Sequence, residues 1–404
     1  MKEVWFRRSA IVDATWDHDR VTPSDLLAVI RATAAGAGLD AVGVAGTEPF
    51  CQARGVIEAR KSAGLHAGMA FTYGRPERST DPARQLPGAR SLVVGARSYW
   101  EPTPHRPDGA HGLVAAYARR DHYAELRTGL SAVAGVLEAA GWRTLVLVDD
   151  NRLVDRAAAH RAGLGWYGKN TNLLLEGLGS WFVLGSVLTD ASLPVAEGQV
   201  PDGCGSCDRC QPACPTGALD QAGAVDARRC LAWLLQDDGI FPRRLRVSLG
   251  DRLYGCDDCQ EACPPNRLRI RRASAGDTGT ASPPAAPARS GEGAWVDLVA
   301  LLASTDEELM ERFGRWYVPR RRAEYLRRNA LVVLANVADG QDPAVVEAVA
   351  RALGDQRPVV RAHAVWAARR LGLDHLLAVV AGDDDPWVRT ELAEPVPVRQ
   401  HITP

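Results

Sequence analysis

The sequence predicts an α/β domain, then a short module organised by cysteines, then a helical C-terminal region, within 404 residues. Three observations lead to this division. Apolar runs of strand length alternate with helical patterns in the first half of the chain. Eight of the nine cysteines lie between residues 204 and 263. A helical motif that begins with proline recurs near the C-terminal end.

Composition and charge set broad limits on the class of protein. Hydrophobic residues make up 46% and charged residues 24%, which is ordinary for a globular chain. The net charge of -1 gives no overall attraction to nucleic acid, so any such binding needs a local basic patch. No apolar stretch approaches the roughly 20 residues of a membrane-spanning helix, and no export signal is visible. We therefore expect a soluble, cytoplasmic monomer with no membrane partner.

The α/β domain is predicted to begin with a helix. Ser24 and Asp25 can cap it, and Leu26, Leu27 and Ile30 follow at helical spacing. Apolar runs then predict four strands, and two longer periodic segments predict helices between them. The strands are expected at 41–45, 91–96, 144–148 and 180–188, and the helices at 124–140 and 153–162.

The C-terminal region is predicted to be wholly helical. It follows a stretch rich in Ala, Ser, Gly and Pro that is typical of a flexible linker. The segment 355–372 is echoed by 383–394, where Pro358, Val360 and Arg361 recur as Pro386, Val388 and Arg389. This pattern indicates HEAT-like repeats, although the spacing is short for HEAT. In RRNALVVLANV, the residues Leu331, Val332 and Leu334 are expected to be core.

The cysteines form two runs that indicate iron–sulfur clusters. The segment CGSCDRCQPACP has the spacing C-x2-C-x2-C-x3-C-P of bacterial two-cluster ferredoxins, in which the fourth cysteine binds the other cluster. A second run, CDDCQEACP, follows it. The alternative is a pair of zinc sites, which also use C-x2-C, but the x3-C-P ending favours clusters. The predicted ligand sets are Cys204, Cys207, Cys210 and Cys263 for cluster 1, and Cys214, Cys230, Cys256 and Cys259 for cluster 2.

Two neighbouring clusters conduct single electrons, so the chemistry is expected to be a reduction. The remaining cysteine, Cys51, is interpreted as a small buried hydrophobic residue. Upstream of the clusters, Asp149, Asp150 and Asn151 follow a predicted strand. One of them can simply cap the next helix, or one can act as an acid. The pattern GLGWYG after that helix is a weak dinucleotide signal, because no strand precedes it.

Four motifs in a fixed order carry a resemblance to a known family. They are VD-x3-L-x-D-R-x3-H-R-AGLGW-x-GKN, GSWF-x-LG, CGSC-x2-C-x3-CPTGA and YGCDDCQ-x2-CP. Together with GLHAGMAFTYGRPERSTDPARQLPGARSLVV at 64–94, they resemble epoxyqueuosine reductase, the cobalamin-dependent enzyme of tRNA queuosine synthesis. The similarity runs from about residue 23 to 392.

The resemblance implies a fold, a reaction and cofactors. The implied fold is a cobalamin-processing, nitroreductase-like α/β catalytic domain, followed by a two-cluster ferredoxin module and a HEAT-like helical region. The implied reaction reduces epoxyqueuosine to queuosine in the tRNA anticodon stem-loop, the last step of queuosine synthesis. Electrons would pass from an unidentified low-potential donor through two 4Fe-4S clusters to cobalamin.

The resemblance also suggests residue roles. The family's essential acid maps onto Asp149, which would protonate the departing epoxide oxygen. Candidate cobalamin contacts are Lys169, Asn170, Asn172, Ser180 and Trp181. Candidate RNA contacts are Arg320, Arg321, Arg322, Arg327 and Arg328, which lie among aromatic residues; the alternative is a solvated helix face.

One departure and two rival functions remain open. The family's Asp-Tyr-His cluster stands here as Asp121-His122-Tyr123, which leaves room for a different substrate. The rivals are a cobalamin and iron–sulfur reductase of another substrate, such as a dehalogenase, and a non-catalytic electron carrier or HEAT scaffold. We divide the chain into an N-terminal extension (1–22), the α/β domain (23–195), the ferredoxin module (196–272), a linker (273–294), the HEAT-like region (295–394) and a tail (395–404).

Overall fold

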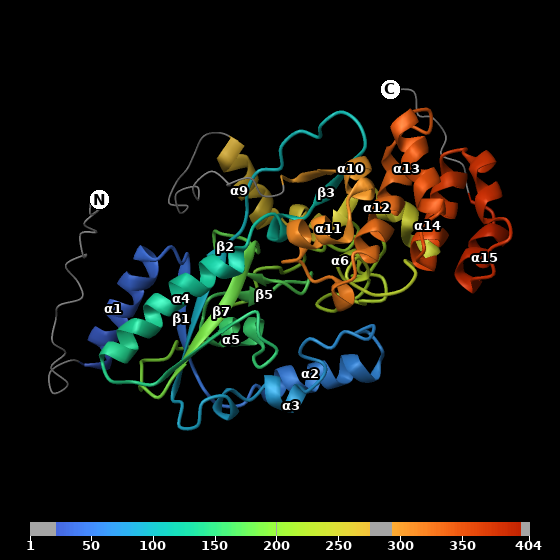
Figure 1. The fold of residues 1–404 in the computed structure, drawn as a ribbon. Helices are drawn as coiled ribbons and strands as arrows, with labels where there is room; N and C mark the ends of the chain where they lie inside the picture. Colours follow the sequence, from blue (N-terminus) through green and yellow to red (C-terminus); the bar gives the residue numbers. More distant parts are fainter. Residues whose placement is uncertain (1–21, 199, 275–292, 397–404) are drawn as a thin grey trace, which may run out of the picture.

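The computed structural model describes residues 22–198, 200–274 and 293–396. Most of the predicted linker, N-terminal extension and C-terminal tail lies outside these residues. An α/β body occupies one side of the molecule and a group of helices the other, with the cysteine-rich segment between them (Figure 1). No helix among the described residues is both long and apolar enough to cross a membrane.

A four-stranded sheet forms the centre of the α/β body, and its strands confirm the four predicted from apolar runs. Their order is β1-β2-β7-β4 and every neighbouring pair is antiparallel. Val44 pairs with Val93, and Leu92 pairs with Leu188. The strands are β1 (Ala41–Gly46), β2 (Ser91–Ser98), β4 (Thr144–Val148) and β7 (Phe182–Thr189).

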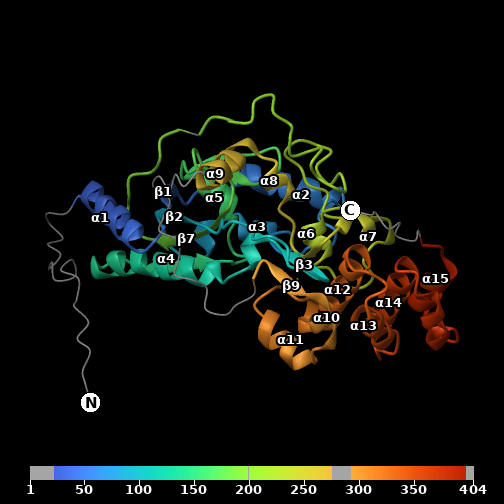
Figure 2. The same ribbon diagram turned by 90° about the horizontal axis from the view of Figure 1, so that it is seen from above.

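Helices cover the two faces of this sheet because successive strand residues point to opposite sides. Val93 packs in one core with α1 (Pro23–Gly36) and α4 (His122–Ala139), which lie side by side in Figure 2. Leu92 packs in the other core with α5 (Asp155–Arg161). All three helices were expected from periodicity.

The cap of α1 differs from the prediction. Thr22, not Ser24, is the N-cap, and its side chain accepts a hydrogen bond from the backbone N–H of Asp25. The Asp25 carboxylate accepts from the Thr22 backbone in return. Pro23 therefore occupies the first helical position, where its missing N–H costs nothing.

A second sheet joins three distant segments of the sequence. Its order is β8-β3-β9, with β3 (His111–Val114) parallel to β8 (Arg252–Tyr254) and antiparallel to β9 (Trp295–Asp297). Each strand comes from a different predicted part of the chain. The remaining strands, β5 (Trp166–Tyr167) and β6 (Leu173–Leu174), form a short hairpin.

The cysteine-rich segment contains three helices of one turn and ends in a longer helix. Its helices are α6 (Leu231–Leu234), α7 (Arg246–Leu249), α8 (Asp258–Glu261) and α9 (Pro264–Ser274). In the α/β body, α2 (Cys51–Ser62) and α3 (Pro76–Ser79) lie apart from the sheet, at the lower edge of Figure 1.

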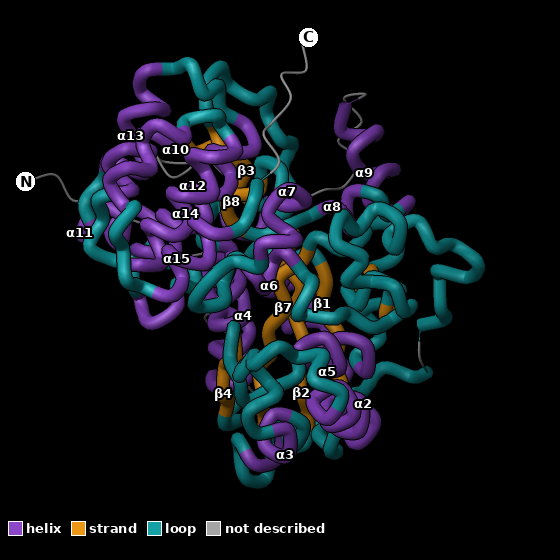
Figure 3. The backbone as a smooth tube through the Cα atoms, turned by 90° about the vertical axis from the view of Figure 1, so that its right-hand side faces the viewer, coloured by secondary structure: helices purple, strands orange, loops and turns teal. Residues whose placement is uncertain are grey.

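Six helices form the C-terminal region and share one large core (Figure 3). The predicted core residues Leu331, Val332 and Leu334 are fully buried in its central helix. This core also contains Val114, Leu234 and Leu253 from earlier segments, so the region is continuous with the cysteine-rich part. The helices are α10 (Leu298–Ala303), α11 (Asp306–Phe313), α12 (Glu324–Val337), α13 (Pro343–Leu353), α14 (Pro358–Arg370) and α15 (Pro386–Ala393).

A buried ion pair attaches the last helix to the cysteine-rich segment, and its removal should destabilise the protein. Arg246 donates to Glu391 at 2.6 Å, and both side chains are buried. Glu391→Ala leaves the guanidinium charge without its carboxylate, which typically costs about 3–5 kcal/mol. Thermal unfolding should therefore occur at a clearly lower temperature. The exposed Glu347→Ala on α13 is the control and should shift the midpoint little; equal shifts would contradict this account.

Candidate cluster sites and the adjoining cavity

Thiols within each of the two predicted sets lie close enough together to affect one another electrostatically. Burial raises the pKa of the Cys263 thiol to about 11, and the thiols of Cys204, Cys207 and Cys210 raise it as well. Burial also raises the pKa of the Cys259 thiol, with further contributions from the other three thiols of the second set and from Asp257. Such effects act only over short distances. Cys214 therefore lies near the thiols of the second run, and Cys263 lies near those of the first.

The local backbone explains how the cysteines converge. Tight turns connect them: the N–H of Cys207 donates to the carbonyl of Cys204, and the N–H of Cys263 donates to that of Gln260. No three potential ligands among the described residues are close enough together to hold one metal ion. A 4Fe-4S cubane holds its thiolates farther apart than a single ion does, because each thiolate binds a different iron.

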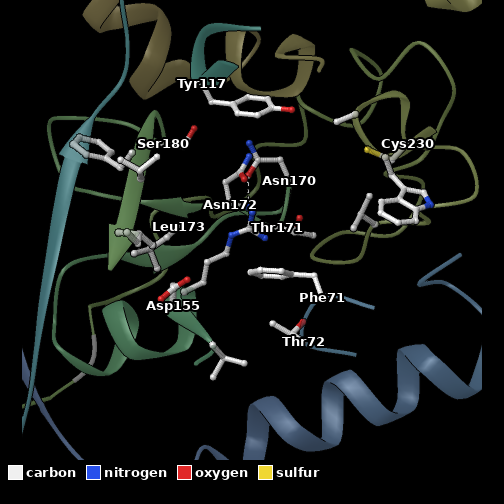
Figure 4. A pocket seen from close by; sticks show the side chains of 18 of the residues that line it. Phe71, Thr72, Tyr117, Asp155, Asn170, Thr171, Asn172, Leu173, Ser180 and Cys230 are labelled. Carbon is white, nitrogen blue, oxygen red and sulfur yellow. Dashed lines mark hydrogen bonds between the residues drawn. The ribbon is translucent and has the colours of Figure 1, made fainter. Parts of the chain in front are cut away.

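A large cavity adjoins the second set of thiols. Its volume is about 2600 Å³, several times that of a pocket for one drug-sized ligand. All four thiols of the second set line it, whereas none of the first set is among its described lining residues. Asn170, Asn172 and Ser180 approach it from one side and Phe71 and Thr72 from the other (Figure 4).

A buried polar network fixes the second cysteine loop to the α/β body. Gln260, between Cys259 and Cys263, accepts hydrogen bonds from the hydroxyls of Ser180 at 2.9 Å and Tyr99 at 3.2 Å. Asn266 accepts from the Ser180 backbone N–H at 2.8 Å. The Asn266 amide donates in turn to the Ser180 hydroxyl and to the Gln260 carbonyl. The cavity wall and the cluster loop are therefore one rigid unit.

The predicted cofactor contacts occupy three kinds of position. Asn172 lines the cavity, and its neighbour Asn170 lines it while donating to the carbonyl of Cys259 at 3.3 Å. Lys169 also lines the cavity, but its amine donates to the carbonyl of Gly205 in the first cysteine loop at 2.7 Å. Ser180 belongs to the network just described. Trp181 requires correction: this residue, directly before β7, is buried in the core beside Trp100 and does not line the cavity.

Asp149 stands at the cavity wall directly after β4. Its φ of 51° is in the left-handed region, which aspartate tolerates better than most residues. Burial raises the pKa of its carboxyl, as do Asp150 and Asp121, while Arg127 lowers it. Asp150 differs, because Arg152 binds it at 2.6 Å and lowers its pKa. No described residue forms a salt bridge with Asp149, so its carboxyl is available to a ligand.

The Asp121-His122-Tyr123 departure has a clear structural outcome. Asp121 caps α4 by accepting a hydrogen bond from the backbone N–H of Ala124. His122 is buried in the interior, where desolvation lowers its pKa to about 4, so its ring is neutral near pH 7. Tyr123 lines the cavity, and burial and the charges of Asp149 and Asp155 raise the pKa of its phenol. The phenol, not the imidazole, faces the ligand space.

Several cavity residues were not singled out from the sequence. Asp155 and the loop 65–73 line the cavity, with Phe71 still 40% exposed. Burial and the Asp149 charge raise the pKa of Asp155. The motif containing Asp155 was visible in the sequence, as was the glycine-rich GLHAGMAFTYG. The spacing of residues in these two motifs does not reveal that they face the cavity beside Asp149. Their position depends on how the loops fold over the sheet.

Two other sequence expectations are corrected. Cys51 is exposed at the start of α2, because none of that helix's residues is buried. Arg327 and Arg328 are buried and therefore cannot contact RNA. Arg327 binds Asp306, and Arg328 donates to backbone carbonyls of residues 234–239. The other three arginines are exposed just after Tyr317, which lines the cavity.

Residues 203–266 match the family model described as a 4Fe-4S double cluster binding domain. The two thiol sets belong to this segment. The chain is thus a protein of the two-cluster iron–sulfur class, with a large cavity beside its second ligand set.

The chain belongs to the epoxyqueuosine reductase family. It is 32% identical to epoxyqueuosine reductase of Xanthomonas campestris, over 88% of this chain and 98% of that protein. It is also 32% identical to that of Bacillus subtilis, over 83% of this chain and 85% of that protein. The structure of Bacillus subtilis epoxyqueuosine reductase with its catalytic loop swung out of the active site matches with a TM-score of 0.80 at 28% identity, covering 92% and 98% of the two chains. An epoxyqueuosine reductase structure with an epoxyqueuosine-modified tRNA stem loop matches with a TM-score of 0.81, at the same identity and coverage.

Gly179 should be required for the polar network. An added Cβ would lie 1.8 Å from Oδ1 of Asn266, and φ is +80°. Gly177 also has positive φ, at +71°, but open space around it. Both alanine variants should lose about 1 kcal/mol to backbone strain, and Gly179→Ala should lose about 1–3 kcal/mol more by displacing Asn266. Thermal unfolding of the cluster-loaded protein measures the difference; equal midpoints for the two variants would refute the role of Gly179.

Proposed function

We propose that this protein reduces epoxyqueuosine to queuosine in the tRNA anticodon loop, the last step of queuosine synthesis. The observation that carries this proposal is the single cavity lined by all four thiols of the second cluster set and by Asp149. The proposed electron source, the second cluster, and the proposed proton source, Asp149, thus border the same cavity. Family membership supplies the substrate, because the relatives that the chain covers almost entirely are epoxyqueuosine reductases.

We propose two 4Fe-4S clusters and cobalamin as the cofactors. The cavity is large enough for a flat macrocycle together with a nucleoside. Asn170, Asn172 and Lys169 would hold the edge of the macrocycle, with the GLGWYGKN backbone close behind it. At Gly165 an added Cβ would lie 2.0 Å from the carbonyl of Leu174, so only glycine permits that close turn. When bound, cobalamin supplies the strongly reducing centre beside the second cluster.

Asp149 is proposed as the general acid. Breaking the carbon–oxygen bond of the substrate leaves an oxygen that needs a proton. A carboxyl whose pKa is raised by burial and by neighbouring carboxylates retains its proton at higher pH than an ordinary aspartate. Tyr123 and Asp155 line the same cavity, together with Arg127 and Arg156. The protein's own contribution is therefore to position the substrate and hold a proton at Asp149.

The reaction can be tested with anaerobically reconstituted protein and an anticodon stem-loop that carries epoxyqueuosine. Mass spectrometry should show loss of one oxygen when iron, sulfide, cobalamin and a chemical reductant are supplied. If cobalamin binds but no oxygen is lost, the substrate differs. If cobalamin does not bind, the catalytic proposal falls and a carrier or scaffold function replaces it.

Asp149→Asn should lower the turnover rate by about 10²–10⁴-fold, the usual contribution of a general acid. Cobalamin and cluster absorption spectra should be unchanged. Because the protonated carboxyl is the active form, the wild-type rate should fall as pH rises through the raised Asp149 pKa. Asp150→Asn is the matched control, since Arg152 already binds that carboxylate. An active Asp149→Asn variant would refute the assignment.

We propose that the stem-loop binds across Arg320, Arg321 and Arg322. These exposed arginines follow Tyr317, and Arg315, Trp316 and Tyr317 line the cavity. Arg320 and Arg321 both have positive φ, a strained conformation that persists only where the surrounding structure maintains it. Phosphates would bind the arginines while the exposed Tyr317 ring stacks on an unpaired base near the cavity.

Replacing the three arginines with alanine should weaken stem-loop binding and its dependence on salt. Each lost phosphate contact should reduce the slope of log K against log salt by about one unit. Fluorescence anisotropy at several salt concentrations measures both quantities. The control replaces Arg31, Arg84 and Arg90, which are exposed on the α/β body, and carries the same change in charge. Identical affinities for the two triple variants would exclude this interface.

We interpret the C-terminal helices as HEAT-like repeats and the α/β body as nitroreductase-like. Pro343, Pro358 and Pro386 each begin a helix, and Arg361 of α14 binds Asp383 just before α15 at 2.6 Å. Arginine thus links successive units, as the repeat pattern indicates. We also propose that the protein acts as a monomer in the cytoplasm and receives electrons from a low-potential donor.

A further inference from the structure

The two cluster sites face different surroundings. The second set of thiols lines the cavity, and the first set does not do so among the described residues. This arrangement leaves the first set free to receive electrons from a donor outside the cavity. Cys263 of the first set directly precedes α9, and the N–H of Arg267 donates to the Cys263 carbonyl at 2.9 Å. The first turn of α9 is thus attached to the entry cluster.

The helix α9 has one face packed on the protein and another turned to solvent. Asn266 is buried in the polar network, and Arg269 lies over the rings of Trp100 and Phe182. By contrast, Arg267, Leu268, Arg271 and Arg272 are all exposed. Residues four apart share a helix face, so 267 lies beside 271 and 268 beside 272. Three arginines therefore surround Leu268, a large apolar side chain that is 46% exposed.

The charge on this face is not neutralised within the described part of the chain, where no salt bridge involves these three arginines. Carboxylates are present nearer the cysteines: Asp202 and Asp208 belong to the first loop, and Glu261 precedes Cys263. These carboxylates precede Cys263 in the sequence. The arginines follow it along α9, and Arg272 lies about 14 Å beyond Cys263 at a helical rise of 1.5 Å per residue. The outer part of α9 is accordingly basic.

The position of α9 favours a protein over RNA as the occupant. In Figures 1 and 3, α9 projects from one edge of the molecule, and α2, which borders the cavity, lies at the opposite edge. No described residue of α9 lines the cavity. An exposed leucine among arginines is also typical of a protein docking surface, where apolar contacts and arginine are both enriched.

We infer that Arg267, Leu268, Arg271 and Arg272 form the docking surface of an acidic one-electron carrier protein that reduces the first cluster. This inference rests on the proposed function, because it presupposes that the clusters must be supplied with electrons. In each encounter the carrier loses one electron and the first cluster gains it. Two such transfers, with two protons from water and the active-site acid, match the two-electron removal of the epoxide oxygen as water.

The test follows cluster reduction directly. Reduced flavodoxin, an acidic one-electron carrier, is mixed anaerobically with the cluster-loaded protein, and bleaching of the cluster absorption is timed at several salt concentrations. The Arg267→Glu, Arg271→Glu double variant should be reduced at least about tenfold more slowly than wild type at low salt, because charge complementarity mainly governs association. Its rate should rise rather than fall with added salt. Arg267→Lys, Arg271→Lys should remain close to wild type.

Controls separate docking from damage to the cluster. Dithionite and reduced methyl viologen, small reductants of opposite charge, should reduce the double-glutamate variant within a fewfold of wild type, with equal iron content. Arg312→Glu, Arg351→Glu, exposed on α11 and α13, carries the same charge change and should leave the flavodoxin rate unchanged. A wild-type flavodoxin rate in the α9 variant overturns the inference, as does a loss confined to stem-loop binding. Failure of wild type to convert epoxyqueuosine with dithionite would instead refute the proposed function.

Discussion

The arrangement of the site depends on the buried hydrogen bonds that join Ser180, Gln260 and Asn266. These residues come from the α/β body and from the second cysteine loop. Each buried polar group there would be costly without its partner, so the bonds permit one relative placement of the two parts. Gly179 makes the contact possible, because no side chain separates its backbone from Asn266. The second ligand set consequently forms a fixed wall of the cavity.

This fixed placement gives the two sets of thiols different surroundings. The first set of thiols is attached to α9 at one surface, and the second set opens on the cavity. Asp149 and Tyr123 come from β4 and α4 instead. In the proposed mechanism, protons arrive from the α/β body and electrons from the cluster module, and the two meet inside the cavity.

The exchange of two residues at the start of α4 illustrates how helix geometry selects a functional side chain. Asp121 caps the helix, and this fixes the direction of every residue that follows. Successive helical residues are rotated by about 100°, so His122 and Tyr123 cannot face the same side. His122 consequently packs in the core, while Tyr123 faces the cavity. Burial lowers the pKa of His122 and raises that of Tyr123, so both rings are uncharged near pH 7.

The sequence by itself predicted the four strands of the central sheet and the helices α1, α4 and α5, because apolar periodicity records which faces must be buried. It did not predict α2, whose residues are not buried, or the short strands β3, β5 and β6. The C-x2-C-x2-C-x3-C-P spacing also predicted a two-cluster module, which the family match over residues 203–266 confirms. Only the tertiary structure decided that Trp181, Arg327 and Arg328 are internal and that Cys51 is exposed. The sequence does not state whether a charged or aromatic side chain contacts solvent, a ligand or a buried carbonyl. That partner is chosen by contacts between distant segments, which local spacing does not contain.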